Sequence, residues 1–145
     1  MQLAPQLVFD GNCAEALDFY AQAFATTINM VSRYGDMPAS EGYTTTPEQA
    51  QKILHAQINM GETVLMLCDN PPHLPYSAGN NFSVAVMFDS QDALQAAFGQ
   101  LKNGGNVAME PQLTFWSECY AMVTDKFGFT WQLTLKSENE IAGHK

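Results

Sequence analysis

Phe9 begins the stretch FDGNCAEAL (residues 9–17), and Phe88 begins a similar stretch, FDSQDAL (88–94). Each contains Phe-Asp, a short polar turn and an acidic residue followed by Ala-Leu, and one stretch lies in each half of the 145-residue chain. A pattern that returns at this spacing is typical of one folding unit used twice. The two stretches therefore predict an internal repeat.

The residues around both stretches support the repeat. QLVF (6–9) and FSVAVMF (82–88) are apolar segments that we expect to form strands. Asn12 and Glu15 form a pattern like a capping box for a helix in the first half, and Ser90 is the capping candidate in the second. Apolar residues then recur at helical spacing, namely Leu17, Tyr20, Ala21 and Phe24 in the first half and Leu94, Ala97, Phe98 and Leu101 in the second.

Further strands are predicted after each helix, at 28–34, 53–60, 62–68, 105–109, 119–124 and 129–135. The fold class is therefore α+β, with two tandem β-α-β-β-β modules at about 1–70 and 80–137. A chain of this length suits a single domain, 1–145. We expect 34–52 to be a long mobile loop with one helical turn, and 69–80 to link the modules.

Composition excludes several classes of partner. The chain has 6 Lys and Arg residues against 15 Asp and Glu residues, so its net charge of −9 disfavours nucleic acid and anionic membranes. No apolar run is long enough to span a bilayer, and the N-terminal residues lack the pattern of a signal peptide. Cys13, Cys68 and Cys119 are too scattered for a disulfide framework or a zinc site, so we expect reduced thiols and a cytoplasmic protein. Cys13 lies at a helix start, where a thiolate is favoured.

Three segments carry a resemblance to a known family. LVFDGNCAEALDFY (7–20), HAQINMGETVLMLCD (55–69) and TFWSECYAMVTDKFGFTWQL (114–133) resemble the PhnB-like branch of the vicinal-oxygen-chelate superfamily. This superfamily includes glyoxalase I, bleomycin-resistance proteins, fosfomycin-resistance enzymes and extradiol dioxygenases. The resemblance covers nearly the whole chain. It implies a curled mixed sheet built from both modules, a cavity between them, and a homodimer.

Alternation along the last predicted strand separates an apolar face from a polar one. Trp131 and Leu133 lie on the apolar face, which we expect under the helices, so Gln132 points toward the cavity. In metal-binding members of the superfamily, His, Gln or Glu side chains occupy such inward positions on the first and last strands of each module. Gln132 therefore marks one of four positions that could hold a metal ion.

The internal repeat locates the other three positions. Gly61 and Gly128 align the last strands of the modules, and Phe9 and Phe88 align the first strands. The resulting positions are Leu65, Ser83 with Ala85, and Gln6 with Val8, or Pro5 when the first module is counted from its helix. None is His or Glu, whereas zinc, nickel and iron prefer imidazole, carboxylate or thiolate donors. We therefore expect neither a metal ion nor another cofactor.

A divalent metal such as zinc, nickel or manganese could instead bind at a relocated site. His55 is the best candidate because it lies in a segment that resembles the family. Its possible companions are His73, His144, Asp69, Glu118 and Cys119. None of them has metal-ligand spacing such as His-x-x-x-His, and a hydrogen-bonded strand histidine explains His55 equally well.

Aromatic side chains mark the wall of a small-molecule pocket. Phe115, Trp116 and Tyr120 surround Glu118, and aromatic rings with a few directed polar groups are typical of ligand pockets. The same rings would also suit the core or a dimer interface. Methionines that would make the lining adaptable are Met60, Met66, Met87 and Met122.

These observations leave three hypotheses for function. The first is metal-independent binding of a small organic molecule, with Gln6, Ser83 and Gln132 offering neutral hydrogen bonds. The second is a metal-dependent lyase, isomerase or group-transfer enzyme in which His55 or Glu118 is a ligand or base. The third is a regulatory module that uses the loop 34–52. The absence of His and Glu at the four inward positions favours the first.

Overall fold

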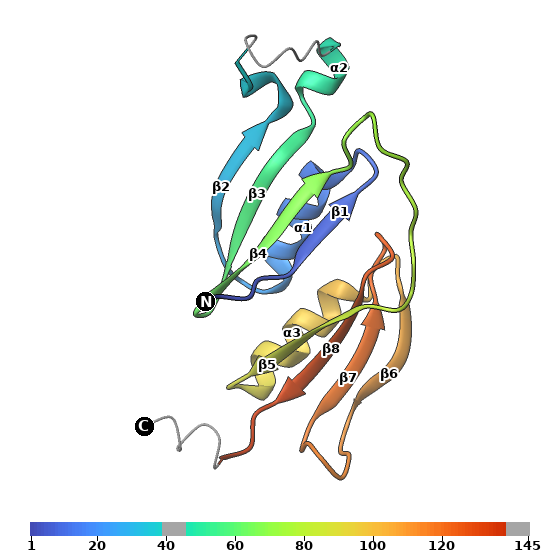
Figure 1. Cartoon of the computed structure of the whole chain (residues 1–145). Coiled ribbons are helices and arrows are strands. Elements are labelled where there is room, and N and C mark those ends of the chain that lie inside the picture. The colour runs from blue at the N-terminus through green and yellow to red at the C-terminus, as the bar shows by residue number, and fades with distance from the viewer. Residues whose placement is uncertain (39–45, 139–145) are drawn as a thin grey trace. The chain divides into compact units, whose positions relative to one another are not determined.

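The computed structural model describes residues 1–38 and 46–138. The chain forms two compact units, Met1–Ser77 and Ala78–Lys145, and each follows the predicted β-α-β-β-β order (Figure 1). The architecture is α+β and glyoxalase-like, as predicted. Among the described residues, no helix has the length and apolar character needed to cross a membrane.

The first unit contains a mixed sheet of four strands in the order β1-β4-β3-β2. β1 pairs with β4 in parallel, whereas the other neighbours are antiparallel. The elements are β1 (Gln6–Phe9), α1 (Cys13–Ala23), β2 (Ile28–Arg33), the 3-10 turn η1 (Tyr34–Asp36), α2 (Pro47–Ala50), β3 (Ile53–Met60) and β4 (Thr63–Asp69).

The second unit repeats this sheet in the order β5-β8-β7-β6, again with a parallel pair between its first and last strands. Its elements are β5 (Ser83–Phe88), α3 (Gln91–Leu101), β6 (Asn106–Gln112), β7 (Tyr120–Thr124) and β8 (Thr130–Leu135). Every predicted strand is therefore present, with ends that shift by a few residues.

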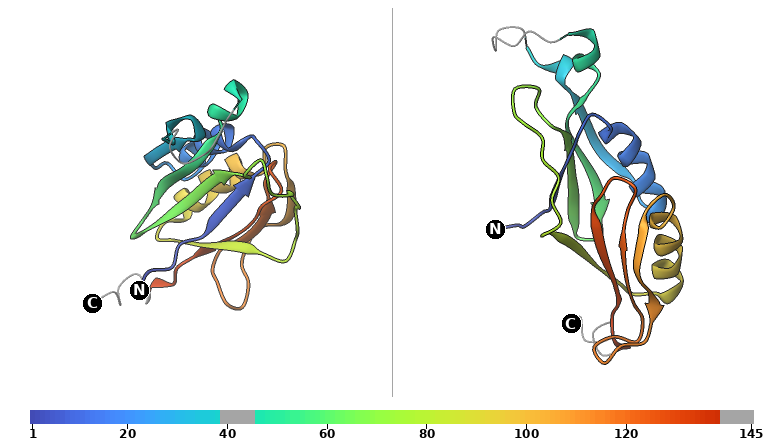
Figure 2. Two further views of the ribbon diagram at one scale, coloured as in Figure 1. Left: turned by 45° about the horizontal axis from the view of Figure 1, so that its top comes forward. Right: turned by 90° about the vertical axis from the view of Figure 1, so that its right-hand side faces the viewer.

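One helix covers one face of each sheet, as Figure 2 shows most clearly for α1 in its right-hand view. The buried side of α1 contacts β3 and β4, and the ring of Tyr20 lies 6.3 Å from that of Phe9. In the second unit the predicted apolar stripe of α3 is buried, and Trp131 and Leu133 of β8 are 0% exposed beneath it. The opposite face of each sheet, called here the helix-free face, carries the alternate side chains.

The two helices begin in different ways. Ser90 caps α3 as predicted, because its hydroxyl accepts a hydrogen bond from the backbone N–H of Ala93 at 3.2 Å. Asn12 precedes α1, but its side chain makes no capping hydrogen bond, so the predicted capping box is wrong on this point. The carboxylate of Asp69 at the end of β4 accepts the Cys13 N–H instead, at 3.0 Å.

The register of β4 corrects one inward position. Leu65 is 1% exposed and lies on the face covered by the helix, so it cannot point into a cavity on the other face. Met66 takes the inward position, since it pairs with Gln6 of β1 just as Gln132 pairs with Ala85 of β5. The error came from aligning glycines in hairpins of different length, because the turn at 61–62 is shorter than the turn at 125–129.

The predicted long loop is partly structured where it is described. The turn η1 follows β2, and α2 matches the predicted helical turn, with Thr46 accepting the backbone N–H of Gln49 at 3.2 Å. Residues 39–45 lie outside the described part of the chain, so the predicted mobility of the loop stays a prediction. His144 also lies outside it.

Candidate functional site

The helix-free face of the second sheet gathers three of the predicted site residues, Ser83, Tyr120 and Gln132. Strand pairing places Ala85, Gln132 and Met122 in one row across β5, β8 and β7. Neighbouring rows contain Ser83, Thr130 and Thr124 on one side and Met87, Thr134 and Tyr120 on the other. These described residues of β5, β7 and β8 include no acidic or basic side chain. The face therefore offers hydroxyl, amide and thioether groups to a ligand.

A hydrogen-bonded chain runs across this face. The Tyr120 hydroxyl donates to Gln132 Oε1 at 2.7 Å, and Gln132 Nε2 donates to Ser83 Oγ at 2.8 Å. Both ends of the Gln132 amide are thereby engaged, which fixes the orientation of its side chain. The Ser83 hydroxyl keeps its own proton for a further acceptor, so the chain can end in a donor toward a ligand.

Aromatic rings extend this chain toward solvent. Trp116 lies edge-on to Tyr120 with ring centroids 5.2 Å apart, and Phe115 lies edge-on to Trp116 at 4.9 Å. Tyr120 is 6% exposed, whereas Trp116 is 54% and Phe115 is 96% exposed. The rings in the segment between β6 and β7 are therefore open surface and not core. They provide an apolar wall beside the polar chain.

Burial also keeps the Tyr120 phenol uncharged. Desolvation raises the pKa of the Tyr120 phenol above its ordinary value of 10.0, so the hydroxyl remains a neutral donor at physiological pH. Glu118 is exposed in the same segment, outside the described hydrogen-bonded chain. The structure thus brings together Ser83, Tyr120 and Gln132 directly.

The other predicted residues lie in the first unit. Gln6 is on the helix-free face of β1, where its amide donates to the Cys68 sulfur at 3.3 Å. His55 lies on the same face of β3, with its Nε2 atom 3.1 Å from the amide nitrogen of Gln57. Gln57 in turn lies beside Met66. Sequence reasoning named Met66 as a lining methionine but not as the inward residue of β4, and it missed Gln57, although alternation from His55 along β3 would have identified Gln57.

The side chains at the four inward positions do not fit zinc, nickel or manganese. Gln6, Met66, Ser83 and Gln132 offer amide, thioether and hydroxyl groups, and these are weak ligands for such ions. The Gln132 amide is also committed to protein hydrogen bonds. Within 1–38 and 46–138, no group of at least three His, Cys, Asp or Glu side chains is placed to hold a metal ion.

The cysteines do not form a reactive centre among the described residues. Cys13 is fully buried, and its burial, followed by the nearby Asp69 and Cys68, raises the pKa of its thiol far above the ordinary range. This corrects the expectation that the helix start would favour a thiolate, because desolvation outweighs the helix dipole. All three cysteines are unpaired and buried.

Comparisons with known proteins support the fold. Residues 2–133 match the family model described as the Glyoxalase/Bleomycin resistance protein/Dioxygenase superfamily. The protein YjdN of Escherichia coli (strain K12) is 28% identical over 143 residues, which cover 93% of this chain and 95% of YjdN. The crystal structure of PA1353 from Pseudomonas aeruginosa has a TM-score of 0.83 and 33% identity, with 94% and 98% of the two chains covered. The PhnB protein from Bacillus cereus has a TM-score of 0.75 and 23% identity, with coverage of 94% and 100%.

Proposed function

The chain belongs to the Glyoxalase/Bleomycin resistance protein/Dioxygenase superfamily, and on this basis we propose that it binds a small organic molecule without the usual metal ion. The proposed site is the helix-free face of the second sheet, around Ser83, Tyr120 and Gln132, with Trp116 as its apolar wall. The observation that carries this proposal is the continuous chain from Tyr120 through Gln132 to Ser83 beside an exposed indole.

The chemistry of this face favours an uncharged ligand or an uncharged part of a larger one. A charged group would lose hydration beside the described strands β5, β7 and β8, which offer only neutral partners, and that loss is costly. A planar apolar group could pack against Trp116, while a carbonyl or ether oxygen could accept the remaining proton of Ser83. Met87 and Met122 can adapt their shape to different ligands.

The test is a ligand screen in which variants locate the site. A library of uncharged aromatic fragments, with bleomycin as an additional probe, is titrated into the labelled protein and followed by NMR. We expect some compounds to shift the Gln132 and Trp116 side-chain signals. Gln132→Met should weaken the binding of those compounds about tenfold, because it removes the part-buried hydrogen bonds that hold Ser83 and Tyr120 in place. Gln100→Met makes the same chemical change on the exposed surface of α3 and should have no effect. Equal weakening by both variants, or binding that leaves these signals unmoved, would refute the site.

Metal-dependent catalysis is the competing outcome. It requires ligands from outside the four inward positions, such as His55 or Glu118. Elemental analysis of untagged protein should find well under one equivalent of zinc, nickel or manganese, in keeping with the poor donors described above. A stoichiometric metal that is lost in His55→Ala or Glu118→Ala would replace the binding proposal with the enzymatic one.

The proposal includes an assembly and a compartment. Leu113 and Phe115 are 75% and 96% exposed, which is unusual for side chains of this size and suits burial against a second copy in a homodimer. Unpaired cysteines suit a reducing compartment such as the cytoplasm.

A further inference from the structure

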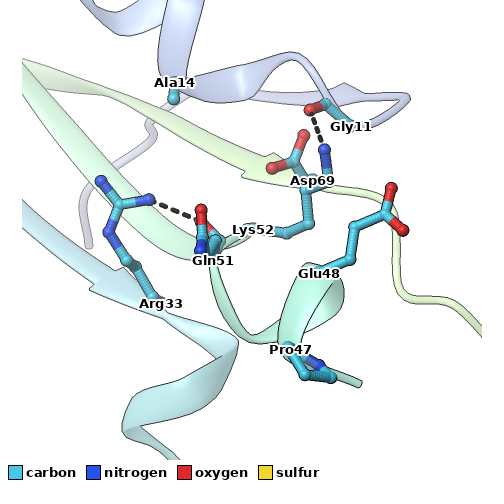
Figure 3. Close-up of a pocket in the computed structure, with 8 residues that line it drawn as sticks. All are labelled: Gly11, Ala14, Arg33, Pro47, Glu48, Gln51, Lys52 and Asp69. Carbon is cyan, nitrogen blue, oxygen red and sulfur yellow. Dashed lines mark hydrogen bonds between the residues drawn. The ribbon is translucent and has the colours of Figure 1, made fainter. Parts of the chain in front are cut away.

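A separate hollow of about 430 Å³ lies in the first unit, at the end of the sheet where α1 begins (Figure 3). This volume is within the range of small-molecule sites. The hollow is lined by Gly11 and Ala14 near the start of α1, Arg33 at the end of β2, Pro47, Glu48, Gln51 and Lys52 in and after α2, and Asp69 at the end of β4. None of these residues belongs to the face proposed above.

Two cationic side chains in this hollow are held in place by backbone carbonyl groups. Lys52 Nζ donates to the carbonyl oxygen of Gly11 at 2.9 Å, and Arg33 Nη1 donates to that of Gln51 at 2.5 Å. Figure 3 shows both side chains extending toward the start of α1. A carbonyl group has no formal charge, so neither of these hydrogen bonds neutralises the cation that makes it. An ammonium has three N–H donors and a guanidinium has five, so both retain donors for a ligand.

Two acidic side chains, Asp69 and Glu48, also line the hollow and differ in burial. Asp69 is 2% exposed, and its two carboxylate oxygens accept the backbone N–H groups of Cys13 at 3.0 Å and Ile53 at 2.9 Å. It therefore serves to join α1, β3 and β4. Glu48 on α2 and Arg33 at the end of β2 are both exposed, so water screens both charges, whereas Lys52 is half-buried.

The hollow gathers cationic side chains that are scarce in this chain. The protein has 6 Lys and Arg residues and a net charge of −9, and two of the six, Lys52 and Arg33, line this hollow together with two acidic residues, Glu48 and Asp69. An anion approaching the molecule is repelled on average, so it would bind only where local donors outweigh that field. Charged donors also make stronger hydrogen bonds to phosphate or carboxylate than neutral ones do.

We propose that this hollow binds the phosphate or carboxylate group of a small organic anion, with Lys52 and Arg33 as its two charged donors. The positive end of the α1 dipole adds to the same field but is not the basis of the site. The remaining volume, bordered by Pro47 and Ala14, accommodates the organic part of the ligand. This site is independent of the function proposed for the second unit.

The test uses inorganic phosphate and succinate as probes, titrated separately into the full ¹⁵N-labelled chain at constant ionic strength. We expect saturable shifts at the backbone amides of Gly11 and Ala14 for at least one probe. Arg33→Gln and Lys52→Met should each weaken binding about tenfold, as expected for the loss of one charge-assisted hydrogen bond. Lys102→Met removes the same charge from an exposed position on the second unit and should leave the affinity unchanged.

A variant that removes a negative charge from the lining is expected to have the opposite effect on anion binding. Glu48→Gln removes an acidic side chain from the lining and should tighten binding of the effective probe a few-fold. Its outcome does not depend on whether Lys52→Met folds, since Glu48 is exposed. The relative affinities of the two probes show whether phosphate or carboxylate is preferred. The absence of saturable shifts with both probes, or equal weakening by Lys102→Met and Arg33→Gln, would overturn the proposal.

Discussion

Removing the carboxylate of Asp125 should destabilise the second unit strongly. This side chain is 3% exposed in the turn between β7 and β8. Its Oδ1 atom accepts the backbone N–H groups of Phe127 and Phe129 at 2.9 and 3.1 Å, and its Oδ2 atom accepts the indole N–H of Trp131 at 2.8 Å. In Asp125→Ala, the indole N–H of Trp131 loses this partner in a site with 0% exposure.

The expected magnitude follows from these contacts. A hydrogen bond to a charged group contributes about 1.5–3 kcal/mol, and the indole bond should reach that range because both partners are buried. The backbone N–H groups of Phe127 and Phe129 are half-buried and can form hydrogen bonds to water instead, so their loss adds a smaller amount to the destabilisation. Together, we expect Asp125→Ala to lower the free energy of unfolding by about 3–5 kcal/mol.

The assay is urea unfolding followed by circular dichroism, which does not depend on the tryptophan that is changed. A double-mutant cycle with Trp131→Phe isolates the indole bond, and we expect a coupling of about 1.5–3 kcal/mol, in the range measured for residues in direct contact. Asp18→Ala removes the same charge from the exposed side of α1 and should change stability by at most about 0.5 kcal/mol. A cost below about 1 kcal/mol for Asp125→Ala, or a coupling near zero, would refute this account of the turn.

Three further predictions concern titration, thiols and assembly. Burial raises the pKa of the Tyr120 phenol above 10.0, so the contribution of the neutral phenol to stability is complete below about pH 10 and is lost as pH rises through the raised pKa. The free energy of unfolding above pH 10 should therefore fall more steeply in the wild type than in Tyr120→Phe. Phenol absorbance that shows Tyr120 ionising at its ordinary pKa would contradict this. Cys13, Cys68 and Cys119 should react slowly with a thiol reagent in the folded chain and fully in urea, and one fast thiol in the native state would count against their burial. Sedimentation should show a dimer that Phe115→Ser weakens, whereas monomer alone at near-millimolar concentration would exclude the proposed dimer.

The parts of the fold that were predictable from sequence depend on local patterns. Ser90 and the apolar stripe of α3 lie within one helix and its first turn, and the alternation of Trp131 and Leu133 lies within one strand. Such signals need no knowledge of distant partners. The helix-free position of Gln132 followed from the same alternation, which is why a predicted site residue lies in the observed hydrogen-bonded chain.

The parts that were not predictable depend on contacts across the chain. Asp69 caps α1 from 56 residues away, so the local pattern at Asn12 gave a wrong expectation. Met66 replaced Leu65 because strand register depends on turn length, and an error of one residue exchanges the two faces of a strand. Ser83 and Gln132 were both predicted to face the site, but the direct hydrogen bond between them, across 49 residues, depends on the parallel pairing of β5 with β8.

The two units keep one sheet topology but differ at the end of the last strand. Phe9 pairs with Asp69 in the first unit, and Phe88 pairs with Leu135 at the corresponding place in the second. Because Asp69 is a carboxylate, it can join the starts of α1 and β3, whereas Leu135 cannot, and α3 relies on the local hydroxyl of Ser90. In the first unit, Lys52 and Arg33 bring charged donors to a hollow that Asp69 also lines, while the helix-free face of the second unit is uncharged in its described strands β5, β7 and β8. A repeat that preserves its hydrophobic core can therefore present two surfaces with different polar groups, because these polar residues lie outside the pattern that specifies the sheet.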